Sequence, residues 1–288
     1  MNTLPFLQVD VFTDRPFLGN PVAVVLDADA LDGAAMQRIA RWTNLSETTF
    51  VLRPSAAGAD YALRIFTPDR ELPFAGHPTL GTARALLAAG RVTPSGGRLV
   101  QQCAAGLVRL RAEGERLFFE VPPASVTRVP AETAASIAGA LGLQAPPPRF
   151  DAIDVGPVWL TAELRDASQV LGLRPDFAAL AELSRAHGVT GVTVHAPFPV
   201  GADARRDSAD VAVRSFAPAA GVPEDPVCGS GNACVAVQRA AAGRRDGYLA
   251  AQGEAIGRDG LITVAYRGDA IEVGGEAIVC VEGRLRIA

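Results

Sequence analysis

The sequence feature that most constrains the fold is a short internal repeat that joins a strand to an apolar helix. Residues 64–68 (RIFTP) match residues 214–218 (RSFAP), 150 positions further along the chain. Slightly later, residues 75–77 (AGH) fall opposite residues 228–230 (CGS), with an offset of 153. In both copies an acidic loop connects the strand to a glycine and then to a helix. The repeat predicts two similar halves.

Each half contains one helix that is apolar on nearly all sides. The spacing predicts these helices over 77–89 and 229–243. A helix with no polar face has to be surrounded by other structure. Many short strand-like runs flank both helices, so we expect mixed α and β halves, each a closed or strongly curved sheet around its helix.

A proline pair at residues 122 and 123 interrupts the pattern of strands. It places a domain boundary between about 122 and 130. The expected N-terminal half is 1–123, with its central helix from about 77 and room for completion by a C-terminal strand. The expected C-terminal half is 130–288, with its central helix from about 229.

The two helix starts are candidate binding sites. Gly76 and Gly229 stand where unpaired backbone N–H groups and the positive end of the helix dipole are available. Glycine lets a ligand approach that backbone closely. Two such starts facing one cleft would bind an anion, most simply a substrate carboxylate. The alternative interpretation is that both glycines only make tight turns.

Composition excludes several kinds of chemistry. All 27 basic residues are arginine, so no lysine can form a Schiff base or serve a nucleotide-binding P-loop. Acidic residues number 31 and no basic block occurs, which argues against a nucleic-acid partner. No stretch approaches 18 apolar residues and the N-terminus does not resemble a signal peptide, so we expect no contact with a membrane.

The cysteines and histidines point to a cytoplasmic protein without a metal. The four cysteines form no C-x-x-C pair and are expected to be reduced. The three histidines are scattered and lack the spacing of zinc ligands. The sequence has no dinucleotide-binding pattern either, and we therefore expect no cofactor.

Four segments together resemble the phenazine-biosynthesis-like (PhzF-like) isomerase family. They are VDVFTDRPFLGNPVAVV at 9–25, NLSETTFV at 44–51, RIFTPDRELPFAGHPTLG at 64–81 and RSFAPAAGVPEDPVCGSGNA at 214–233. Each is weak alone, but they occur in the expected order across nearly the whole chain. The resemblance implies an α+β, diaminopimelate-epimerase-like fold: two pseudo-symmetric domains, each a barrel-like sheet around a central helix. It also implies a homodimer, an active site between the domains and no cofactor.

The resemblance assigns catalytic roles to three residues. The family's acid/base carboxylate falls on Glu47, its histidine on His77 and its aspartate on Asp225. Taken alone, Glu47 would be an ordinary solvated residue between a helix and a strand. His77 could equally be a capping or core histidine, and Asp225 could close a turn. A carboxylate screened from water can have its pKa raised toward neutrality and both accept and donate a proton.

Substrate binding is assigned by the same resemblance to Gly76, Gly229 and Ser230. Ser230 alone could simply cap its helix. Cys228 is a secondary candidate, because a thiol at a helix N-terminus can have a lowered pKa. The interpretation we favour for Cys228 is a small, buried and inert cysteine.

The sequence therefore predicts a cofactor-independent isomerase that moves a proton within a small carboxylate-bearing metabolite. The family's named reaction uses trans-2,3-dihydro-3-hydroxyanthranilate. One alternative is an amino-acid racemase or epimerase using Glu47 and Cys228. Related two-base enzymes carry a cysteine at both helix starts, whereas Ala75 occupies the first position here. The second alternative is a non-catalytic small-molecule binding protein.

Overall fold

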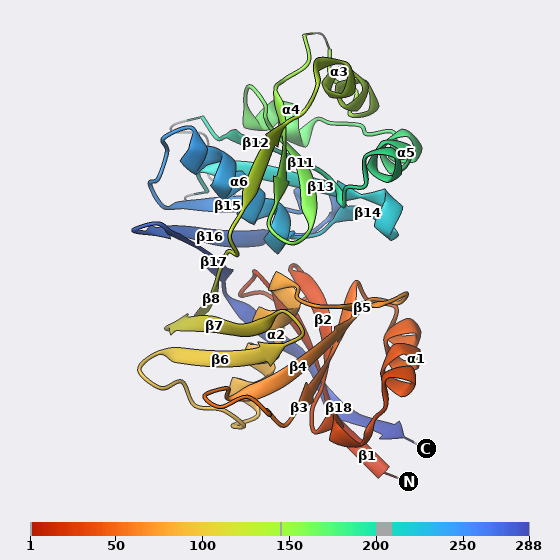
Figure 1. Cartoon of the computed structure of the whole chain (residues 1–288), viewed down its shortest axis with the longest axis vertical. Helices are drawn as coiled ribbons and strands as arrows, with labels where there is room; N and C mark the ends of the chain where they lie inside the picture. Colours follow the sequence, from red (N-terminus) through yellow and green to blue (C-terminus); the bar gives the residue numbers. More distant parts are fainter. Residues whose placement is uncertain (1, 145, 200–208, 288) are drawn as a thin grey trace. The chain divides into compact units, whose positions relative to one another are not determined.

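The computed structural model describes residues 2–144, 146–199 and 209–287. The chain divides into two compact units (Figure 1). The first unit comprises Met1–Glu120 and Gly274–Ala288, and the second comprises Val121–Val273. The expected C-terminal half, 130–288, is therefore too long at its end. The reason is that β18 (Ala277–Ile287) pairs antiparallel with β1 (Asn2–Val11) along nearly its whole length.

The first unit combines one curved sheet with two helices. Its remaining elements are β2 (Asn20–Val25), α1 (Gly33–Thr43), β3 (Glu47–Leu52), β4 (Tyr61–Phe66), β5 (Glu71–Leu72), α2 (Gly76–Ala88), β6 (Arg98–Cys103), β7 (Gly106–Glu113) and β8 (Arg116–Glu120), with a short 3-10 turn at Ala28–Ala30. The strands pair in the order β18–β1–β2–β3–β4–β6–β7–β8, and β5 adds to β4. The β2–β3 and β4–β6 pairs are parallel, so each needs a crossover, which α1 and α2 provide.

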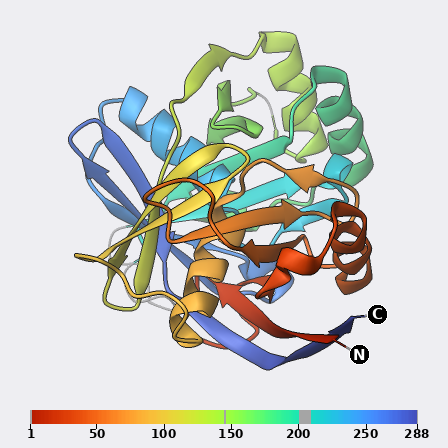
Figure 2. The same ribbon diagram turned by 60° about the horizontal axis from the view of Figure 1, so that its bottom comes forward.

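Helix α2 is the central helix of the first unit. It packs against β1, β2, β3, β8 and β18, which include both ends of the strand order, so the sheet curves around it. Residues 76–83 of this helix are all buried. In Figures 1 and 2 the blue β18 runs beside the red β1, and the two chain ends lie near each other. This arrangement confirms the expected sheet around a central apolar helix.

The second unit has its own sheet and helices. Its elements are β9 (Ser125–Arg128), α3 (Ala131–Ala140), β10 (Phe150–Asp154), β11 (Val158–Glu163), α4 (Ala167–Leu171), α5 (Phe177–His187), β12 (Gly191–Pro197), β13 (Val211–Ala217), β14 (Val222–Asp225), α6 (Gly229–Ala241), β15 (Tyr248–Gln252) and β16 (Gly260–Arg267), with 3-10 turns at Pro218–Ala220 and Glu254–Ile256. β17 (Ala270–Gly275) carries the chain across the division between the units.

The strand pairing of the second unit repeats that of the first. Its order is β9–β10–β11–β12–β13–β15–β16, with β14 added to β13. The β11–β12 and β13–β15 pairs are parallel, as β2–β3 and β4–β6 are in the first unit. Helix α6 packs against β10, β11, β12 and β16 and occupies the place of α2. The internal repeat seen in the sequence is therefore a repeat of topology.

Close packing of the central helix depends on a glycine. A Cβ atom at Gly81 of α2 would lie 2.3 Å from Cγ1 of Val22 and 2.9 Å from Cγ2 of Val11. Both neighbours are stiff, β-branched side chains on buried strands, so neither can move away easily. The glycine thus sets how closely α2 approaches β1 and β2.

No helix in the described residues is long and apolar enough to cross a membrane.

We predict that Gly81→Ala destabilises the protein by about 1–3 kcal/mol through overpacking. The matched control is Gly139→Ala in α3, where the added Cβ would meet nothing within 4 Å. That control should be neutral or stabilising by about 0.5–1 kcal/mol, because alanine restricts the unfolded chain. Urea unfolding of both variants measures the difference. Equal stability of the two variants would contradict the packing argument.

Candidate active site

Glu47 and His77 come together in the first unit. Glu47 is the first residue of β3 and His77 is the second residue of α2. The Oε2 atom of Glu47 lies 3.3 Å from Nε2 of His77. The side chains are only 15% and 8% exposed, respectively. Glu47 is therefore not the solvated residue that its sequence position alone would suggest.

His77 is a neutral imidazole at physiological pH. Burial lowers its pKa to about 3, and a hydrogen bond to the backbone of Pro21 offsets that effect only in part. Since one ring nitrogen bonds to Pro21, Nε2 presents a lone pair toward Glu47. Nε2 of the neutral ring therefore faces the Glu47 carboxyl group as an acceptor, in a contact that is largely screened from water.

The start of α2 presents backbone rather than a capping side chain. Ala75 occupies the N-cap position and has no side-chain acceptor for the first amides. A Cβ atom at Gly76 would lie 2.6 Å from the ring of Phe119, so only glycine fits there. The ring of Phe119 packs edge-on against Phe74. No described side chain caps the amides of Gly76 and His77, and amides at a helix start suit an anion.

Asp225 is the candidate site residue of the second unit that carries a carboxyl group. It is the last residue of β14, and its Oδ1 accepts a hydrogen bond of 3.1 Å from the backbone N–H of Val227. Burial raises its pKa to about 6, while hydrogen bonds from Cys228 and Val227 act in the opposite direction. Asp225 can therefore change its protonation state close to neutral pH.

Cys228 lies beside Asp225 but is not an activated thiol. Its side chain caps α6 by accepting from the backbone N–H of Gly231 at 3.2 Å. Burial and the neighbouring Asp225 raise its pKa well above the usual range. The lowered pKa considered from the helix start is therefore wrong, because desolvation outweighs the helix dipole. Its burial, at 3% exposed, and the direction of the pKa shift favour the inert, protonated cysteine.

Ser230 does not cap α6, because the helix begins at Gly229 and Cys228 supplies the cap. Its Oγ accepts a hydrogen bond of 3.0 Å from Nε1 of Trp159, a buried residue of β11. The same hydroxyl lies 3.6 Å from the Cys228 sulfur. Trp159 was not among the residues that the sequence singled out, although a buried tryptophan needs a partner for its N–H.

An arginine–glutamate pair fixes each hairpin that leads to a central helix. Arg64 of β4 donates to both carboxylate oxygens of Glu71, at 2.7 and 2.6 Å. Arg214 of β13 does the same to Glu224, at 2.9 and 2.8 Å. The second pair is almost fully buried, and Nη1 of Arg214 also donates to the backbone carbonyls of Val170 and Leu173. Bidentate geometry of this kind holds the hairpin rigidly.

The described residues contain no group of three His, Cys, Asp or Glu side chains able to hold a metal ion.

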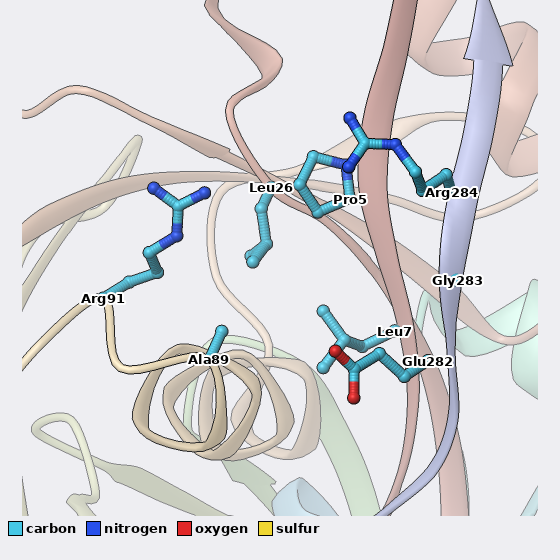
Figure 3. Close-up of a pocket in the computed structure, with 8 residues that line it drawn as sticks. All are labelled: Pro5, Leu7, Leu26, Ala89, Arg91, Glu282, Gly283 and Arg284. Carbon is cyan, nitrogen blue, oxygen red and sulfur yellow. The ribbon is translucent and has the colours of Figure 1, made fainter.

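A surface pocket of the first unit lies at the C-terminal end of α2 (Figure 3). Its wall includes Leu7, Leu26, Ala89 and Glu282. None of the site residues lines it, and it is at the opposite end of α2 from His77.

Known proteins are similar to this chain over nearly its whole length. The family model for phenazine biosynthesis-like proteins matches residues 9–283. The chain belongs to this family. It is 39% identical over 298 residues to antisense-enhancing sequence 1 of Schizosaccharomyces pombe, covering 97% of each chain. It is 35% identical over 292 residues to trans-2,3-dihydro-3-hydroxyanthranilate isomerase of Pseudomonas aeruginosa, covering 97% of this chain and 98% of that one.

A solved structure gives the same result. The PhzF family protein of Enterococcus faecalis superposes with a TM-score of 0.81 and 30% identity, covering 99% of this chain and 100% of that one. The diaminopimelate-epimerase-like fold is confirmed, and the chain is an isomerase of the family. The racemase and non-catalytic alternatives are not favoured by these relatives.

We predict that Cys228 reacts with iodoacetamide at least about ten-fold more slowly than Cys103 near pH 8, because only the thiolate attacks. Cys228 is buried and its pKa is raised, whereas Cys103 is only half-buried. Mass spectrometry of labelled peptides over time gives the two rates. Faster labelling at Cys228 would restore the activated-thiol interpretation.

Proposed function

We propose that this isomerase moves a proton between two carbons of a small carboxylate-bearing metabolite similar to trans-2,3-dihydro-3-hydroxyanthranilate. The observation that carries the proposal is the contact of 3.3 Å between the Glu47 carboxyl group and the neutral imidazole of His77. A half-enclosed carboxyl group next to a neutral base can accept a proton and return it without losing it to water. The relatives named as isomerases of that substrate support the choice.

In the proposed reaction Glu47 takes the proton from one carbon and delivers it to another on the same face. No electrons enter or leave, so the step needs no oxidant or reductant. His77 stays neutral, and its Nε2 accepts a hydrogen bond from the Glu47 carboxyl group once that group has taken the proton. Asp225, whose pKa is about 6, donates a hydrogen bond in its protonated form and steadies charge on the conjugated intermediate.

The substrate carboxylate is proposed to bind backbone amides at a helix start, and each unit offers one. Gly76 begins a helix with no capping side chain, and the amides of Gly229 and Ser230 precede the capped Gly231 in α6. Amides at a helix N-terminus point along the positive end of the dipole and suit an anion. Ser230, whose oxygen already accepts from Trp159, keeps its own proton to donate.

The compartment, oligomeric state and partners that we propose are those expected from the sequence. We propose a cytoplasmic homodimer that requires no cofactor and binds neither nucleic acid nor membranes. All four cysteines are free thiols, which supports a reducing compartment. The acidic formal net charge of −4 supports the absence of a nucleic-acid partner.

We predict that Glu47→Gln lowers turnover by about two to four orders of magnitude while the fold persists, because the amide keeps the shape but cannot accept the proton. Glu182→Gln on the exposed side of α5 is the matched control and should keep native turnover. Turnover of trans-2,3-dihydro-3-hydroxyanthranilate and thermal unfolding are measured together. Native turnover in Glu47→Gln would exclude Glu47 as the proton carrier.

Cys228→Thr should keep most activity, since the proposed proton transfer through Glu47 needs no thiol. Threonine can still cap α6, because its hydroxyl accepts from a backbone amide. The measurement is solvent deuterium incorporation by the native protein and the variant, with amino acids of both hands and with the dihydro-anthranilate. Exchange of an amino-acid α-proton by the native protein but not by Cys228→Thr would establish the racemase instead.

A further inference from the structure

A single buried side chain of β15 connects both ends of the loop that precedes α6. Gln252 is only 2% exposed. Its Nε2 donates to the backbone carbonyl of Asp225 at 2.9 Å. Its Oε1 accepts from the backbone N–H of Cys228 at 3.2 Å and from Nδ2 of Asn232 at 2.9 Å. The amide thus bridges the end of β14, the N-cap of α6 and the first turn of that helix.

We propose that Gln252 is a positioning residue: it fixes the loop from Asp225 to Cys228 and thereby sets the place of the Asp225 carboxyl group. This inference rests on the proposed function, in which Asp225 serves the reaction. Among the described residues, the hydrogen bonds of the Gln252 side chain go to loop and helix atoms, so its effect on chemistry is transmitted through that loop.

The packing below the loop supports the same conclusion independently. A Cβ atom at Gly253 would lie 2.6 Å from the carbonyl oxygen of Pro226, and one at Gly260 would lie 2.2 Å from Cγ2 of Val227. Gly253 also has a φ of 104°, which favours glycine. The β15–β16 hairpin therefore touches the loop directly, while Gln252 fixes the ends of the loop by hydrogen bonds. Movement of the loop requires both contacts to break.

The repeat offers a matched comparison in the first unit. Gln101 lies on β6, which pairs in parallel with β4 as β15 pairs with β13. It is fully buried and donates to Oγ1 of Thr79 at 3.0 Å. Thr79 precedes Asn232 by 153 positions, the same offset as the two helix starts. Gln101 also accepts from the hydroxyl of Tyr61, so it shares the burial and location of Gln252 without any bond to the loop at Asp225.

The first test replaces each glutamine by leucine, which removes the hydrogen bonds at similar volume. In Gln252→Leu we expect Cys228 to react with iodoacetamide at least about ten-fold faster and its backbone amide to exchange hydrogen faster. Turnover should fall about 10–100-fold with little change in KM. Gln101→Leu should lose comparable thermal stability yet label Cys228 at the native rate. Native labelling in Gln252→Leu, or faster labelling with native turnover, overturns the proposal.

The second test is Gln252→Glu, which distinguishes the hydrogen bonds from simple packing. A protonated glutamic acid accepts through its carbonyl oxygen and donates to the Asp225 carbonyl, as glutamine does. The ionised form has no donor and faces that carbonyl oxygen. Of the titratable groups near it, the Asp225 carboxyl group opposes a second negative charge when it is ionised, and the Cys228 thiol is protonated and neutral. Arg258 packs against the neighbouring Gly253 and is a nearby positive charge.

The ratio of Gln252→Glu turnover to native turnover should therefore lie near one at acidic pH and fall as the pH rises. Taking the ratio removes the native pH dependence. A ratio that does not change with pH would overturn the hydrogen-bonding role. If the native protein does not convert the dihydro-anthranilate, the proposed substrate fails, while the labelling of Cys228 in the two leucine variants still decides the role of Gln252.

Discussion

The burial of an almost wholly apolar helix inside each curved sheet is the constraint on which the rest of the structure depends. Such a helix offers polar groups only at its ends. In the first unit Gly81 brings α2 against β1 and β2, and Gly76 brings its first turn against Phe119. Side chains for chemistry must then come from strand ends beside that turn, as Glu47 does from β3. The helix start is thereby both the binding element and the point around which the acid–base residues collect.

Placing ionisable groups beside such a helix has an energetic consequence. Asp225 has a pKa of about 6 in the folded protein against an ordinary value of 3.8, so the folded state binds its proton more tightly. The stabilisation that this proton contributes is complete below the ordinary pKa of 3.8 and decreases as the pH rises toward 6. The loss at neutral pH is at most about 3 kcal/mol, since part of the residue remains exposed. The buried Arg214–Glu224 pair and the Gln252 bridge hold the loop in place against that cost.

The fold was largely predictable because its signals are local or repeated. The apolar runs located α2 and α6 to within two residues, and R-x-F-x-P followed by glycine revealed the duplication. β15 has only a weak local signal, because Tyr248–Gln252 has no β-branched residue and ends in a polar one. The hydrogen-bonding groups of the buried Gln252 side chain find partners at Asp225 and Cys228, which are more than 20 positions away in the sequence. A local sequence pattern does not reveal such partners. The same holds for Trp159, whose partner Ser230 is 71 positions away.

The site residues show where a resemblance and physical reasoning differ. Sequence position alone made Glu47 a solvated residue, and only the pairing of β3 beside α2 encloses it. For Cys228 the dipole argument had the right location and the wrong sign, because burial dominates over a partial charge at the helix end. The duplicated scaffold has thus diverged at its two helix starts. One is uncapped and lies beside Glu47 and His77, and the other is capped by a protonated thiol beside Asp225. A pair of thiols working symmetrically is impossible with Ala75 at the first start, and a single carboxyl group that both takes and returns the proton requires no such symmetry.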